Sequence, residues 1–242
     1  MHFHPLAFCT LTAPLSLVAC ATTNSATLAT SQIQPKLAVQ VNAAPAGGDT
    51  FISAILEQPG SLSRVQLAPG DVLAAKTDKD EKLALDYDSV LQIYSVRLAK
   101  VVDRASVGIL LTRASGATAH GSSIQLPPAI ALTSPAPNAE VSYKRGAGAL
   151  EIAWSNPTHG GTVHFFPYPC GSAAISTKVI QTPDHGSFSL PARELVMAAP
   201  ATHECVTIRI ERDVAGTVDT AFAPTSAFTG LRYDYVNVNV VP

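Results

Sequence analysis

Residues 150–157 read Leu-Glu-Ile-Ala-Trp-Ser-Asn-Pro. Leu150, Ile152 and Trp154 recur at every second position, and Asn156-Pro157 then interrupts the pattern. Because successive side chains of a strand point to opposite faces of a sheet, this alternation is typical of a half-buried strand that ends at a turn. The same pattern recurs along much of the chain, while apolar residues at helical spacing are less frequent. The sequence therefore predicts an all-β protein.

The region 129–242 has the strand rhythm of a β-sandwich. Trp154 comes early in this region, and turn residues separate short alternating segments, as in immunoglobulin- or fibronectin-type domains. In an antibody domain the two cysteines bracket the tryptophan, whereas Cys170 and Cys205 both follow Trp154. The resemblance to an immunoglobulin-like fold therefore rests on the spacing of strands and turns, and the antibody cysteine pattern is not part of it. The segments we expect to be strands are 130–132, 150–154, 163–168, 174–180, 187–190, 206–210 and 231–241.

The region 49–128 predicts a separate, N-terminal β domain. Within it, residues 107–111 form a nearly continuous apolar run, which indicates a central strand buried on both faces. Pro127-Pro128 closes the region and suggests a hinge before the second domain. The expected strands are 51–56, 65–67, 72–75, 83–87, 91–98, 107–111 and 122–126.

The N-terminus has the features of an export signal. Residues 1–19 contain no Lys, Arg, Asp or Glu, and the apolar run 5–19 is shorter than the roughly 20 residues of a membrane span. Leu17-Val18-Ala19-Cys20 resembles the lipobox of bacterial lipoproteins, which implies cleavage before Cys20 and attachment of lipid to its sulfur. The positions before the apolar run depart from the pattern, because they hold His2 and His4 instead of Lys or Arg. The alternative is an ordinary secretory signal.

Two further inferences follow from this signal. By resemblance to known sorting rules, Ala21 and Thr22 after the cysteine favour the outer membrane, because aspartate is absent there. Residues 20–48 then predict a lipidated cysteine and a flexible tether, since residues 21–48 are of low complexity and hold one charge, Lys36. A coil of this length would span roughly 30 Å. Leu37, Val39 and Val41 alternate, so a short strand within the tether is also expected.

The two remaining cysteines predict a disulfide. Cys9 leaves with the signal and Cys20 takes the lipid, which leaves Cys170 and Cys205 in a chain bound for an oxidising compartment. The alternatives are a metal-binding pair or free thiols, and neither cysteine belongs to a CxxC motif.

Composition excludes one class of partner. The 16 basic and 18 acidic residues are nearly balanced, so the chain has no basic field for nucleic acid. No cofactor motif was found, and we expect no cofactor.

Three short motifs resemble catalytic or metal sites. His159-Gly160-Gly161 is similar to an esterase oxyanion loop, but no G-x-S-x-G motif accompanies it, so a plain loop is the better interpretation. The segment 184–187, Asp-His-Gly-Ser, holds the residue types of a serine triad, yet neighbours on a strand face opposite ways and a tight turn is favoured. Four histidines fall in the second region without zinc-ligand spacing, and we interpret them as surface residues: His159, His164, His185 and His203.

A run of aromatic residues before Cys170 is the remaining candidate. With a period of two, His164, Phe166 and Tyr168 share one face of a strand, while Phe165 faces the other way. These rings would form either a platform for a sugar or peptide or part of the hydrophobic core.

The chain as a whole resembles uncharacterised proteobacterial outer-membrane lipoproteins. The resemblance rests on LVAC, SIQLPPAIALTSP, IAWSNP, YPCGS, HECVTIRIER and GTVDTAF. It implies an envelope address and tandem β domains, but no activity. From the sequence we expect a non-enzymatic binding or structural module that contacts the membrane through its lipid and has a protein or glycan partner. The alternatives are a metal- or serine-dependent hydrolase of envelope polymers, and an inhibitor or immunity-type partner of a secreted protein.

Overall fold

The computed structural model describes residues 22–42, 50–61, 63–77, 82–98, 106–143, 149–171, 178–196 and 202–242. These residues form β-strands and three short 3-10 helices, which confirms the prediction of an all-β protein with several sheets. None of the described segments is a helix that is long and apolar enough to cross a membrane. The predicted signal, residues 1–19, and Cys20 lie outside the described residues.

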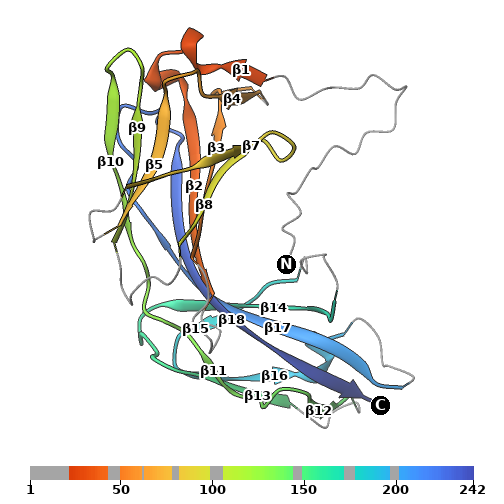
Figure 1. Ribbon diagram of the computed structural model, residues 1–242. Helices are drawn as coiled ribbons and strands as arrows, with labels where there is room; N and C mark the ends of the chain where they lie inside the picture. Colours follow the sequence, from red (N-terminus) through yellow and green to blue (C-terminus); the bar gives the residue numbers. More distant parts are fainter. Residues whose placement is uncertain are drawn as a thin grey trace, which may run out of the picture. The chain divides into compact units, whose positions relative to one another are not determined.

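The chain divides into two compact units, shown in Figure 1. The first comprises the described residues up to Gln40, from Thr50 to Leu126 and from Val214 to Gly230. The second comprises Val41 and Asn42, and the described residues from Pro127 to Asp213 and from Leu231 to Pro242. A boundary therefore lies next to Pro127-Pro128, where the sequence suggests a hinge.

The first unit contains most of the shorter strands. Its elements are β1 (Thr22–Asn24), η1 (Ser25–Thr27), η2 (Thr30–Gln32), β2 (Gln34–Asn42), β3 (Thr50–Glu57), β4 (Arg64–Gln66), β5 (Val72–Thr77), β6 (Lys82–Ala84), β7 (Asp86–Asp88), β8 (Ile93–Leu98), β9 (Ser106–Thr112) and β10 (Thr118–Gln125). One sheet has the order β10-β9-β5-β6, and a second contains β1-β4-β3-β2, with β8 and β7 added beside β3.

The predicted tether is wrong for the part of it that the structure describes. Residues 22–42 form β1, two 3-10 turns and β2. The physical reason is the apolar alternation within the segment: Ile33, Leu37 and Val39 are at most 3% exposed, in the interior of the first unit. Burial of these side chains offsets the entropy lost when a low-complexity segment becomes ordered.

The two units do not coincide with the expected contiguous domains 49–128 and 129–242, because residues 214–230 belong to the first unit. Phe222 and Phe228 in this segment are each 3% exposed. The backbone N–H of Ala223 donates to the carbonyl of Ile33 at 3.0 Å. Both phenylalanines are thus core residues of the first unit, although the sequence places them after most of the second.

Strand β9 differs from its prediction in one respect. Val107, Ile109 and Leu111 are fully buried, but Gly108 and Leu110 between them are half-buried. The strand pairs with β5 on one side and β10 on the other, so it is internal to its sheet. Only one of its faces is fully buried, since the sheet packs against the core on that side alone.

The second unit places one core between two sheets. Its elements are β11 (Leu132–Ser134), β12 (Ala139–Ser142), β13 (Ala149–Trp154), β14 (Thr162–Pro169), β15 (Ile180–Pro183), β16 (Ser187–Pro191), η3 (Ala192–Glu194), β17 (Glu204–Ala215) and β18 (Ala227–Val241), the last two strands continuing past the unit's bounds. One sheet has the order β11-β13-β16, and the other contains β18-β17-β14-β15, with β12 beside β18. Both sheets contribute to the core: Ile152 and Leu190 come from the first, and Phe165, Ile208 and Val238 from the second. Of the expected strand 174–180, residues 174–177 lie outside the described residues.

Candidate binding face of the second unit

Strand β14 separates its side chains into two faces. Phe165 is fully buried, and its ring lies 5.6 Å from Trp154 in an edge-to-face contact and 5.7 Å from Phe188. His164, Phe166 and Tyr168 are half-buried on the other face, as the period-two pattern predicts. The rings of His164 and Phe166 are 6.5 Å apart, edge to face. This outward group is the starting point of the candidate site.

Strands β17 and β18 continue this face. Phe166 pairs with Arg209 across the β14–β17 ladder, and His164 pairs with Glu211. The guanidinium of Arg209 lies 3.9 Å from the ring centre of Tyr233 on β18 and also forms an ion pair with Glu211. A cation over an aromatic face is attracted by the ring quadrupole, so this contact holds Arg209 against the sheet.

We call this surface the aromatic face. It is made of half-buried side chains from three neighbouring strands, and Tyr235 belongs to it because β18 alternates between buried and half-buried residues. None of the three strands contains a lysine. The members of the aromatic face are His164, Phe166, Tyr168, Arg209, Glu211, Tyr233 and Tyr235.

Burial and neighbouring charges shift the pKa of two groups of the aromatic face in opposite directions. Burial raises the pKa of the Tyr168 phenol, and the charge of Arg209 opposes this effect. Burial also raises the pKa of the Glu211 carboxyl, against the charges of Arg209 and His164. Both side chains are half-buried, so water only partly reaches this side of the sheet.

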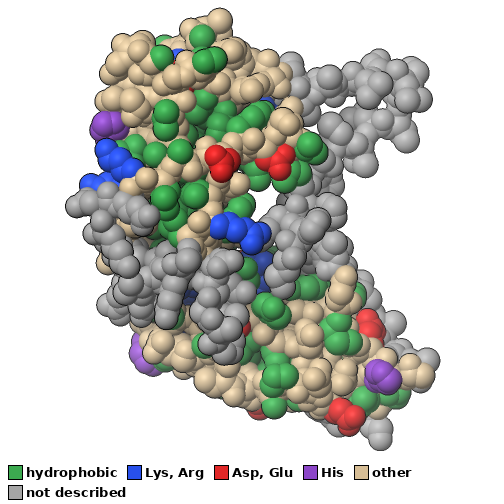
Figure 2. Space-filling view, in the orientation of Figure 1, with side chains coloured by type: hydrophobic (Ala, Val, Ile, Leu, Met, Phe, Trp, Pro, Cys, Tyr) green, Lys and Arg blue, Asp and Glu red, His purple; other side chains and the backbone are tan. Residues whose placement is uncertain are grey.

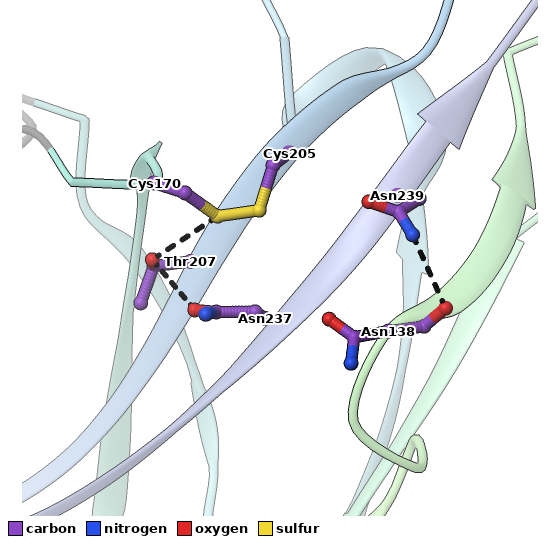
Figure 3. The surroundings of a disulfide bond; sticks show 6 residues. All are labelled: Asn138, Cys170, Cys205, Thr207, Asn237 and Asn239. Carbon is purple, nitrogen blue, oxygen red and sulfur yellow. Dashed lines mark hydrogen bonds between the residues drawn. A yellow bond between two sulfur atoms is a disulfide. The ribbon is translucent and has the colours of Figure 1, made fainter.

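The predicted disulfide is confirmed and lies at one end of β14. Cys170 and Cys205 are bonded, with their Cα atoms 5.4 Å apart. The hydroxyl of Thr207 lies 3.7 Å from the sulfur of Cys170 and donates to Oδ1 of Asn237 at 2.8 Å (Figure 3). The disulfide and this hydrogen bond thus link β14, β17 and β18 beside the aromatic face.

Asp184 is a buried structural centre of the second unit. Its side chain is 0% exposed and accepts hydrogen bonds from the indole N–H of Trp154 at 2.7 Å and the hydroxyl of Thr158 at 2.7 Å. The guanidinium of Arg212 lies 2.8 Å from Oδ2. Although burial opposes ionisation, the hydrogen bonds from Thr158 and Trp154 and the charge of Arg212 hold the pKa of Asp184 below its usual range.

The two loops that resemble catalytic motifs surround this centre. Residues 184–186 form the turn between β15 and β16, as predicted, and Gly186 has a φ of +90°. In the other loop, a Cβ on Gly161 would lie 2.6 Å from the hydroxyl of Thr158, so a glycine is needed where the loop approaches itself. Both segments are therefore explained by the packing around Asp184.

The histidines do not form a metal cluster within the part of the chain that the structure describes, where no group of three candidate ligands is found. The rings of His159 and His185 are 6.4 Å apart on the two loops around Asp184. His164 lies within 3.5 Å of the carboxylate of Asp213. In Figure 2 the histidine side chains visible on the second unit lie apart from one another.

Arg212 was not identified from the sequence, although the alternating pattern of β17 indicates its burial. It lies in phase with Val206, Ile208 and Ile210, the buried side of β17. An arginine in a buried register predicts a buried carboxylate partner, because unpaired charges are almost never buried. Tyr233 and Tyr235 were also missed. Their place on the outer face could have been predicted from the alternation of β18.

Comparisons with known proteins give structural similarity alone. No protein-family model matches the chain, and no curated protein matches its sequence. Among solved structures, a segment of two fibronectin type III domains from chicken tenascin covers 82% of this chain and 98% of its own, with 10% identity and a TM-score of 0.24. The fibronectin(III)-like modules of Clostridium thermocellum CbhA cover 86% of this chain and 93% of their own, with 12% identity and a TM-score of 0.21. This likeness to fibronectin type III structures is distant and carries no functional conclusion.

Proposed function

We propose that this chain is a lipid-anchored protein of a bacterial envelope, attached through Cys20 to the outer membrane, and that it acts as a non-enzymatic binding module. Its second unit is an immunoglobulin- or fibronectin-like sandwich, and the aromatic face of that unit contacts a protein partner. The support for the anchor is the sequence Leu17-Val18-Ala19-Cys20 after an uncharged apolar run.

The composition of the aromatic face is the observation that carries the binding proposal. Interfaces between proteins are enriched in tyrosine, phenylalanine and arginine and depleted in lysine relative to the rest of the surface. The aromatic face combines four rings of the first two types with Arg209, and β14, β17 and β18 contain no lysine. Tyrosine adds a hydroxyl that can bond to a partner while the ring is covered.

Rigidity adds to this support. Arg209 is already held by Tyr233 and Glu211, and the disulfide fixes β14 to β17. A binding surface whose side chains are fixed before association loses less entropy when a partner docks. The same face would suit an inhibitor or immunity-type protein, which is a protein-binding module of this kind.

The environment of Asp184 gives no comparable support to a hydrolase. A serine relay through His185 would need a carboxylate free to orient that imidazole. Both oxygens of Asp184 accept bonds from other groups, Trp154 to one oxygen and Thr158 and Arg212 to the other. These bonds explain the burial of Asp184 without a catalytic role.

Site-specific photocrosslinking in living cells tests the proposal. A benzophenone amino acid replaces Phe166 in one variant and Tyr235 in another, and Glu151 in the control. Glu151 is exposed on β13, whose other face carries the buried Leu150 and Ile152. We expect both face positions to trap the same envelope protein, identified by mass spectrometry, and Glu151 not to trap it. Equal trapping at Glu151, or a sugar adduct in place of a protein, would overturn the protein-partner proposal.

A further inference from the structure

The segment that follows the proposed lipid site is fixed to the first unit. Ser25 is fully buried, and its hydroxyl donates to Oδ2 of Asp71 at 2.7 Å and accepts from the N–H of Ala68 at 2.7 Å. Arg113 forms an ion pair with Asp71 at 2.8 Å and donates to the carbonyl of Ser25 at 2.6 Å. The side chains of Asp71 and Arg113 are 4% and 8% exposed. A segment that is held by a buried network of hydrogen bonds and an ion pair cannot serve as a flexible spacer.

Cys20 precedes the first residue of β1 by only two positions in the sequence. Strand β1 begins at Thr22, which pairs with Arg64 of β4. Because an extended chain advances at most about 3.6 Å per residue, Cys20 lies within roughly 7 Å of Thr22. This is far less than the roughly 30 Å that a flexible tether would span.

One turn of the first unit reaches the same place and presents an apolar side chain. The turn after β7 is closed by Asp88, whose Oδ1 accepts from the N–H groups of Val90 at 2.8 Å and Leu91 at 2.9 Å. The next residue, Gln92, donates from its amide to the hydroxyl of Thr22 at 3.4 Å. Val90 is 88% exposed, the most exposed large hydrophobic residue among those described. In Figure 1 the turn between β7 and β8 lies below β4, the strand that pairs with β1.

From this juxtaposition we infer that the turn Asp88–Gln92 is a membrane-contact element, and that Val90 inserts into the interfacial region of the bilayer that holds the Cys20 lipid. This inference rests on the proposed lipidation of Cys20. Cys20, which would carry the acyl chains, lies within roughly 7 Å of Thr22, and Thr22 is hydrogen-bonded to the turn. A lone apolar side chain on a protein surface is usually unremarkable. Here its place two residues before Gln92, which is hydrogen-bonded to Thr22, assigns it a lipid surface as partner.

A fluorescent probe at position 90 tests the inference. Purified, lipidated Val90→Cys protein is labelled there with a polarity-sensitive dye, since Cys20 would carry lipid and Cys170 and Cys205 form a disulfide. The labelled protein is incorporated into vesicles of phosphatidylethanolamine and phosphatidylglycerol, with and without doxyl-labelled lipid. We expect a blue shift of the emission and quenching by the doxyl groups. The matched control carries twelve Gly and Ser residues inserted between Ala21 and Thr22, and both effects should be lost with this spacer.

The outcomes distinguish this inference from the proposal on which it rests. Palmitate incorporation and signal cleavage are measured on the same preparations. If lipid is attached but the emission at position 90 stays that of a water-exposed dye, the membrane contact is overturned and the anchor remains. If no lipid is attached, both are overturned. A blue shift that persists in the spacer variant would show that the turn binds lipid without help from a short anchor, which also contradicts the inference.

Discussion

Nη2 of Arg212 lies 2.8 Å from Oδ2 of Asp184, and the two side chains are 4% and 0% exposed. The same guanidinium donates to the carbonyls of Pro128 at 3.0 Å and Asn156 at 3.1 Å. This one ion pair therefore connects the start of the second unit, the loop after β13, the β15–β16 turn and β17. We regard it as the principal polar contact in the interior of that unit.

Removal of the arginine should strongly destabilise the second unit. Arg212→Met leaves Asp184 charged and buried without its partner, which costs about 3–5 kcal/mol in unfolding free energy. The matched control is Arg193→Met, because Arg193 is 78% exposed and an exposed arginine contributes little. Denaturant unfolding followed by Trp154 fluorescence provides the measurement. Equal effects of the two substitutions would contradict the structural role of the pair.

Acid should weaken both units through two aspartates. Hydrogen bonds and an arginine outweigh the effect of burial and lower the pKa of Asp71 and of Asp184. Their stabilising contribution is thus complete above the pKa of an unfolded aspartate, about 3.9, and is lost as pH falls further through the lower folded-state values. Unfolding free energies measured between about pH 6 and pH 2 should decrease in that range. Asp184→Asn should be less stable at neutral pH and should show a smaller decrease, and an unchanged pH profile in that variant would contradict the assignment.

Loss of the disulfide should affect the second unit selectively. Cys170→Ala together with Cys205→Ala removes a crosslink with a sequence separation of 35, and the expected cost is about 2–5 kcal/mol. Hydrogen exchange should show faster exchange in β14 and β17, while β5 and β9 should keep their protection. Thiol titration of the oxidised wild-type protein should find neither cysteine free. A reactive thiol at position 170 or 205 would be incompatible with the bond.

The anchor has a direct test. Cys20→Ser should abolish metabolic labelling with palmitate and leave the precursor uncleaved before residue 20, since serine offers no thiol for the lipid. A substitution at Cys9, within the predicted signal, serves as the control and should leave labelling intact. Persistent labelling of Cys20→Ser would mean that another residue carries the lipid, or that the lipobox interpretation is wrong.

Strands with simple alternation were predictable from the sequence. Residues 150–154 and 163–168 fall within β13 and β14, and the outward group His164, Phe166 and Tyr168 follows from a period of two. The disulfide was predictable because only Cys170 and Cys205 remain once Cys9 is assigned to the predicted signal and Cys20 to the predicted lipid. These features depend on the local alternation of residue types or on a count of cysteines. Both kinds of information can be read from one sequence.

Features that depend on distant partners were not predictable in this way. Residues 22–40 have the composition of a linker, and their order comes from packing in the first unit. Residues 214–230 return to that unit because Phe222 and Phe228 fill its core, which no local signal specifies. Likewise, Asp184 has the sequence context of a turn, and its burial depends on Trp154, Thr158 and Arg212 from three other segments.

Binding of a protein to the aromatic face can be measured through the affinity of the crosslinked partner for variants of that face. Tyr235→Ala and Phe166→Ala are compared with wild type and with Glu151→Ala by calorimetry, after circular dichroism has shown that all four proteins are folded. If these rings lie at the centre of the interface, each truncation should cost about 2 kcal/mol or more, a roughly thirty-fold loss of affinity. Glu151→Ala should bind like the wild type. Unchanged affinity in both ring variants would contradict the claim and place the binding surface elsewhere.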